Sequence, residues 1–211
     1  MSITIKNATP GLLPGLSKIN YKEYPECMFA MLAAFLPESE GGELRRVAGK
    51  VAFRSEDKDG NTYRNGLLHS FDDMPALRTG SQQEWWVDGK RHRDGDMPAV
   101  VDNTRQEWWV DGKRHRDGDM PAVVDDQSKF WYKNGFLHRE GDLPAALNNG
   151  NQIWCKNGLF HRDCDKPALI LGDNREEWWW NGKRHRYGDP AVIDPDSGEQ
   201  EWWNDGEFIS K

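Results

Sequence analysis

Hydrophobic and polar positions follow one pattern that recurs from about residue 60 to the end of the chain. In one copy, the aromatic pair Trp108-Trp109 is followed by Asp111-Gly112, a charged segment, and Pro121-Ala122 with two apolar residues after it. Asn-Gly and Asp-Gly accept positive φ at both turn positions, so they are strong short signals for a β-hairpin. The pattern therefore predicts an aromatic strand, a tight turn, and a return through the Pro-Ala strand.

The period of this pattern is given by the six histidines, which are spaced 23 or 24 residues apart. We number units 1 to 6 after them, and a truncated unit 7 begins at Trp202. The segment 83–102 recurs without change at 106–125, so chance does not explain the repeat. The histidines that define units 1 to 6 are His69, His92, His115, His138, His161 and His185.

The repeat predicts an all-β fold, an open antiparallel β-hairpin repeat array with a period of about 23 residues. We expect six and a half repeats over residues 53–211 and an N-terminal segment over 1–52. Units of such an array bury their faces against neighbours, which suits a chain that is only 36% hydrophobic. In the N-terminal segment, Glu26 to Leu36 is expected to form one short helix. That helix either caps the open end of the array or docks a partner.

Composition narrows the classes of partner. A net charge of -7 argues against general affinity for nucleic acid or anionic lipid. No apolar stretch approaches the roughly 20 residues of a membrane span, and the start of the chain lacks the features of a secretion signal. Three cysteines do not form a disulfide framework. We therefore expect a cytoplasmic protein that does not bind membranes.

The histidine column has two interpretations. It is a row of metal ligands or general bases, or each histidine is structural and bonds to the backbone or to the turn aspartate. Equivalent residues two strands apart lie roughly 10 Å from each other, so successive histidines cannot share one ion. This spacing favours structural histidines, with no metal and no cofactor.

The arginine that follows each histidine also suggests chemistry. Arg93 precedes Asp94 and Asp96, and later units pair Arg162 with Asp165 and Arg186 with Asp189. An active site is usually single, whereas this arrangement recurs in each unit. An arginine–carboxylate fork that pins the loop of its own unit is the favoured role.

The aromatic pair forms two columns, because neighbouring residues of a strand face opposite sides of a sheet. The first column is Trp in units 2 to 7, and we assign it to the packed face, beside the recurring alanine of Pro-Ala. The second column is either an exposed aromatic stripe that binds a partner or a second buried layer. Its members, apart from Cys155, are Trp86, Trp109, Tyr132, Trp179 and Trp203.

The arrangement of Trp, Asn-Gly-Lys and His at this period resembles the MORN repeat, a β-hairpin unit. A variant with W-x-x-N-G-x-x-H-R-x-x-x-x-P-A, found in phage, bacterial and giant-virus proteins, is more similar still over about residues 60 to 211. The MORN glycine after histidine is replaced here by Arg93 and Arg116, among others, so lipid binding is not carried over.

The expected function is a non-catalytic scaffold that binds another protein. Its candidate binding residues are the second aromatic column together with Arg93 and Arg116. The resemblance further implies a phage protein that binds and inhibits or redirects a host bacterial factor. The alternative is a sponge for small ligands or nucleotides that uses the Trp and Arg columns. The sequence identifies neither the partner nor the oligomeric state.

Overall fold

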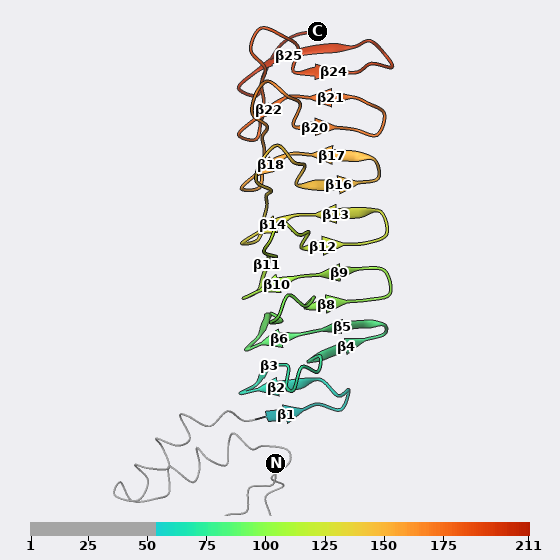
Figure 1. Cartoon of the computed structure of the whole chain (residues 1–211), viewed down its shortest axis with the longest axis vertical. Helices are drawn as coiled ribbons and strands as arrows, with labels where there is room; N and C mark the ends of the chain where they lie inside the picture. The colour runs from blue at the N-terminus through green and yellow to red at the C-terminus, as the bar shows by residue number, and fades with distance from the viewer. Residues whose placement is uncertain (1–53) are drawn as a thin grey trace, which may run out of the picture. The chain divides into compact units, whose positions relative to one another are not determined.

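The structure is a computed structural model that describes residues 54–211, and this part of the chain contains short antiparallel strands and turns but no helix. Successive units stack in sequence order, hairpin upon hairpin (Figure 1). The predicted all-β hairpin array is confirmed. The helix expected from Glu26 to Leu36 lies outside the described residues.

The main sheet is an antiparallel meander whose strand order follows the sequence, so its first and last strands are not neighbours. Each unit contributes the strand after Pro-Ala and the following strand that leads to the aromatic pair. Its strands are β4 (Leu77–Thr79), β5 (Gln82–Glu84), β8 (Val100–Val101), β9 (Gln106–Glu107), β12 (Val123–Val124), β13 (Ser128–Phe130), β16 (Ala146–Asn148), β17 (Asn151–Ile153), β20 (Leu169–Ile170), β21 (Glu176–Glu177), β24 (Val192–Ile193), β25 (Gln200–Asn204) and β26 (Glu207–Ser210).

The Asn/Asp-Gly turns of units 2 to 6 form a second column of small hairpins along one side of the main sheet (Figure 1), whereas the turn of unit 7 joins β25 and β26 of the main sheet itself. Unit 1 differs, because its hairpin belongs to a three-stranded sheet of β1 (Arg54–Glu56), β2 (Thr62–Arg64) and β3 (Leu67–Leu68). The other hairpins are β6 (Trp86–Val87) with β7 (Lys90–Arg91), β10 (Trp109–Val110) with β11 (Lys113–Arg114), β14 (Tyr132–Lys133) with β15 (Phe136–Leu137), β18 (Cys155–Lys156) with β19 (Leu159–Phe160), and β22 (Trp179–Trp180) with β23 (Lys183–Arg184).

The two columns arise because in units 2 to 6 the aromatic strand is divided at its first tryptophan, whereas the sequence predicted one continuous strand. The backbone N–H of Trp108 donates to the carbonyl of Ala122 in the main sheet, 2.8 Å away. Its own carbonyl accepts from His115 N at 3.1 Å, on the side of the small hairpin. The chain thus passes from one hydrogen-bond ladder to the other at this residue.

The Asn/Asp-Gly turns have the predicted geometry. Asp111 and Gly112 have φ of 48° and 77°, and the corresponding turns of the other units also have positive φ at both positions. Gly112 N donates to the carbonyl of Arg91 in the preceding hairpin at 3.0 Å, which links consecutive hairpins. A Cβ on Gly112 would lie 3.6 Å from the Lys90 side chain, which is an ordinary contact distance. Glycine is therefore favoured here because it adopts the left-handed conformation, not because a side chain would clash.

The core of the described residues consists mainly of indoles and alanines. The first-column tryptophans of units 2 to 6 are only 5–7% exposed, which confirms their assignment to the packed face. The alanine of each Pro-Ala pair, from Ala76 to Ala191, is 0% exposed. Trp85 N donates to the Ala99 carbonyl at 2.8 Å, so these residues are neighbours just beyond the ends of β5 and β8. Among residues 54–211, no helix is long and apolar enough to cross a membrane.

Candidate binding grooves and the Trp–Arg ladder

Four of the five buried first-column tryptophans link their own unit to the one before it. Trp108 Nε1 donates to the backbone carbonyl of Asp96 at 3.0 Å, and Trp85, Trp131 and Trp178 make the same bond at 3.0–3.1 Å. The guanidinium carbon of Arg116 lies 3.8 Å from the Trp108 ring centroid, a cation–π contact that recurs in units 2 to 6. The first-column tryptophans therefore have a structural role.

The arginine forks connect units, and the predicted pairing within one loop is wrong. Arg116 Nε and Nη2 donate to the two carboxylate oxygens of Asp96, one unit earlier, at 2.8 and 2.9 Å. Arg93 pairs with Asp73 in the same way, Arg162 contacts Asp142, and Arg186 pairs with Asp165. Because the stacked loops bring the aspartate of the previous unit within reach, the fork joins neighbours. The Arg116 hydrogen bond lowers the pKa of Asp96.

The histidines have the structural role that the sequence favoured. His115 Nδ1 accepts the backbone N–H of Asn134 in the next turn at 3.0 Å, and the other five histidines accept the equivalent N–H at 3.0–3.3 Å. His115 Nε2 lies 3.0 Å from Asp117 Oδ1. This arrangement assigns the neutral tautomer with the proton on Nε2. Each ring thus holds the next hairpin in place.

The second aromatic column is intermediate between the two alternatives that the sequence left open. Trp86, Trp109, Tyr132, Trp179 and Trp203 are half-buried, and Cys155, at the corresponding position, is buried. Burial raises the pKa of the Cys155 thiol to about 11, so this thiol is protonated at neutral pH. Among the other predicted site residues, Arg93 and Arg116 have side chains only 12% exposed and form the forks described above.

Half-buried rings and arginines alternate from unit 2 to unit 4. The Arg91 guanidinium lies 5.2 Å from the Trp86 ring centroid and 5.3 Å from that of Trp109. Arg114 lies 5.0 Å from Trp109 and 5.5 Å from Tyr132. We call these five residues the Trp–Arg ladder. The arginines that stack on its rings extend across unit boundaries, so the ladder joins three hairpins.

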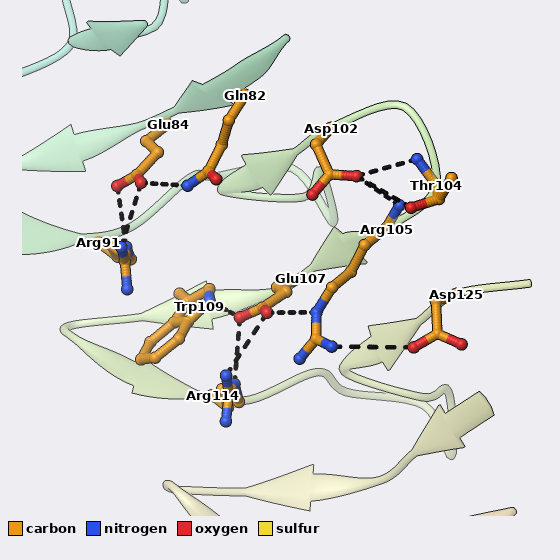
Figure 2. Close-up of polar contacts among 10 residues, drawn as sticks. All are labelled: Gln82, Glu84, Arg91, Asp102, Thr104, Arg105, Glu107, Trp109, Arg114 and Asp125. Atoms are coloured by element: carbon orange, nitrogen blue, oxygen red, sulfur yellow. Dashed lines mark hydrogen bonds and ion pairs between the residues drawn. The ribbon is translucent and has the colours of Figure 1, made fainter. Parts of the chain in front are cut away.

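Buried glutamates support the ladder from the adjacent strands (Figure 2). Glu107 accepts Trp109 Nε1 at 2.9 Å, Arg114 Nε at 3.1 Å and Arg105 Nε at 2.6 Å. Glu84 accepts from Trp86 and Arg91 in the same manner. Burial raises the pKa of Glu107, but the hydrogen bonds and charges of Arg114 and Arg105 outweigh that effect, and the net pKa is lowered.

The sequence interpretation missed these glutamates, although the repeat itself carries a signal for them. Units 2, 3 and 6 have Glu two residues before the second aromatic and Arg five residues after it. In units 4 and 5 both positions change together, to Phe130 with Leu137 and to Ile153 with Phe160. An ion pair is thus replaced as a whole by an apolar pair, which indicates spatial contact.

Shallow grooves lie between the His-Arg loops of consecutive units, and ladder residues are among their lining, Trp109 between units 2 and 3 and Tyr132 between units 3 and 4. The groove between units 2 and 3 has a volume of about 460 Å³, and its lining includes Met97, Val110 and Met120. A row of exposed apolar side chains continues along this loop edge through four successive units. Its members, which we call the methionine row, are Met74, Met97, Met120 and Leu143, each 45–55% exposed.

The charge of the grooves changes along the array. The groove between units 2 and 3 is lined by two arginines against three aspartates, Asp94, Asp96 and Asp117. The groove between units 3 and 4 has three cations and three carboxylates. The groove between units 4 and 5 has four cations, including Lys156 and Lys166, against three carboxylates. The net charge of the groove lining is therefore negative between units 2 and 3, and it becomes positive between units 4 and 5.

Comparison with known proteins adds no family to this picture, since no family model and no curated protein matches the chain. Within residues 54–211, no group of three or more His, Cys, Asp or Glu side chains is arranged to hold a metal ion. The chemistry of the described residues is thus that of stacked rings, ion pairs and exposed apolar side chains.

Proposed function

We propose that the protein is a non-catalytic scaffold that binds another protein along the loop edge of units 1 to 4. The observation that carries this proposal is the methionine row, which exposes four large apolar side chains in register. Exposed apolar residues in a continuous patch are typical of interaction sites, and methionine adapts readily to a partner surface.

The charge around the row indicates the chemistry of the partner. Asp94 and Asp117 are 97% exposed beside Met97 and Met120, and each contacts the histidine of its own loop. The partner segment is therefore apolar and flanked by cations, because complementary charge favours association and correct orientation. The proposed site is centred on the methionine row, and Trp109, Arg93 and Arg116 of the binding residues expected from the sequence line the same groove.

Other parts of the proposal rest on the resemblance to MORN-like repeats of phage proteins. These are membership of that repeat class, a phage origin, a host bacterial factor as the target, and a cytoplasmic location. The alternative, a small-ligand or nucleotide sponge, requires rings and guanidinium groups that are free to contact the ligand. The Trp and Arg columns are instead occupied by contacts with each other and with carboxylates, which favours the scaffold.

The experiment is affinity capture from a bacterial lysate, repeated with variants and followed by mass spectrometry. The double variant Met97→Asp/Met120→Asp is expected to lose a partner that the wild type retains. Phe136→Asp is the matched control, because Phe136 is 57% exposed in strand β15 and does not line the grooves described above. A partner that binds all three proteins equally, or is lost only with Phe136→Asp, contradicts the proposal.

A further inference from the structure

One repeat departs from the hydrogen-bond pattern that the others share. Of the five buried first-column tryptophans, four donate Nε1 to a backbone carbonyl of the preceding loop. The exception is Trp154, whose Nε1 is buried without a hydrogen-bond partner although the ring is only 5% exposed. A buried donor without an acceptor is costly, so an exception of this kind needs an explanation.

The cause lies in the preceding loop. Asp73, Asp96, Asp119 and Asp165 adopt positive φ of 50–55°, and their carbonyls accept the four satisfied indoles. Asp142 occupies the corresponding place but is not among the residues with positive φ. Its loop therefore leaves Trp154 without the carbonyl that the frame provides elsewhere.

A second hydrogen-bond donor beside Trp154, Nη2 of Arg162, also lacks the bond that its counterparts make in other units. Arg93, Arg116, Arg139 and Arg186 each donate Nη2 to the second oxygen of their aspartate. In unit 5, Lys166 Nζ takes that oxygen of Asp142 at 2.5 Å, and Arg162 keeps only its Nε bond at 2.6 Å and a bond from Nη1 to the Pro167 carbonyl. Lys166 stands where Met97 and Met120 stand in units 2 and 3. A single change in the repeat thus frees Arg162 Nη2.

Both donors line one groove. Trp154, Arg162 and Lys166 are among the lining residues of the groove between units 4 and 5, which has a volume of about 190 Å³. The Arg162 guanidinium carbon lies 3.7 Å from the Trp154 ring centroid and the Arg162 side chain is 14% exposed, so the two side chains pack against each other in this groove. The volume is below the range typical of drug-sized ligands. Its four cations against three carboxylates favour an anion.

We propose that the groove between units 4 and 5 binds a small oxyanion, a phosphate or a carboxylate, through Trp154 Nε1 and Arg162 Nη2. The acceptor oxygens of such a ligand satisfy the indole N–H and the free guanidinium N–H together, as charge-assisted hydrogen bonds do. This site shares Leu143 with the methionine row, but it does not require the proposed scaffold function.

The test follows the indole N–H signals of ¹⁵N-labelled protein in NMR spectra during titration with inorganic phosphate and, separately, with acetate. Ionic strength is held constant with sodium chloride. The Trp154 signal, assigned by its absence in Trp154→Phe, is expected to shift and saturate, while the Trp108 signal stays fixed. A response to phosphate alone or to acetate alone identifies which oxyanion the groove takes.

Lys166→Met is the matched variant, since it restores the residue of units 2 and 3 and leaves both oxygens of Asp142 to Arg162. It is expected to weaken oxyanion binding by about tenfold or more while the array stays folded. Met120→Lys, the reverse change outside the groove between units 4 and 5, should leave the Trp154 titration unaltered. A Trp154 signal that does not respond to either anion, or that moves together with the Trp108 signal, overturns the proposal.

Discussion

The grooves between units 2 and 3 and between units 4 and 5 share one backbone frame but differ in what they present. The first has Met97 and Met120 in its lining, and its buried indole, Trp108, is hydrogen-bonded. The second has Lys156 and Lys166 in its lining and an indole without an acceptor. The positions that recur in both grooves form links between units. The few positions that differ determine which ligand each groove suits.

Substitution of a recurring buried tryptophan is expected to have the largest effect on the free energy of unfolding. Trp108→Ala removes a buried ring, its hydrogen bond to Asp96 and its stacking with Arg116, and should lower the free energy of unfolding by about 3–5 kcal/mol. Trp109→Ala removes a half-buried ring from the ladder and should cost clearly less. Urea denaturation of both variants measures the difference. Equal losses would show that both columns are equally important to packing.

The second prediction concerns the Glu107–Arg114 ion pair, which units 4 and 5 replace with apolar side chains. Arg114→Leu leaves Glu107 buried with only Arg105 as a cationic partner, and we expect a loss of about 2–3 kcal/mol. The double variant Glu107→Phe/Arg114→Leu adopts the residues of unit 4 and should recover most of that loss. Chemical denaturation of the single and double variants gives their coupling.

The acid sensitivity of the same variants provides a control for this coupling. Because the folded-state pKa of Glu107 is lowered, its contribution to stability is present above the ordinary glutamate pKa and lost as the pH falls through the lowered value. The double variant lacks this carboxylate, so its stability should fall less on acidification than that of the wild type. A double variant less stable than Arg114→Leu would contradict the interpretation of the paired change.

Sequence reasoning predicted those features that depend on local chemistry. Asp111-Gly112 specifies its own turn, and the first tryptophan of each pair is in the packed layer as expected. Features that depend on the distance between stacked units were not predicted. Arg116 pairs with Asp96 of the previous unit, because stacking brings together loops that are 20 residues apart in the chain. A spacing within one unit cannot reveal such a partner.

The candidate grooves were also beyond the sequence interpretation, for a related reason. Strand alternation separates Trp108 from Trp109, but it does not indicate that Glu107 draws the second ring down against the sheet. Nor does it place Met97 and Met120 in the lining of one groove. Comparing the units with each other, position by position, would have identified the Glu–Arg exchange and the replacement of methionine by Lys166.

The smallest predicted effect distinguishes the two grooves at one atom. Trp108→Phe and Trp154→Phe remove the same part of an indole from equally buried positions, which are 7% and 5% exposed. Only Trp108→Phe also breaks a hydrogen bond, the one to the Asp96 carbonyl, and it leaves that carbonyl without its donor. A hydrogen bond of this kind contributes about 1 kcal/mol, so Trp108→Phe should be less stable than Trp154→Phe by about that amount. Urea denaturation in a buffer free of phosphate and carboxylates measures the difference. Equal stability of the two variants would mean that Trp154 Nε1 has an acceptor in solution even without an added anion, and that the two grooves differ less than their hydrogen bonds indicate.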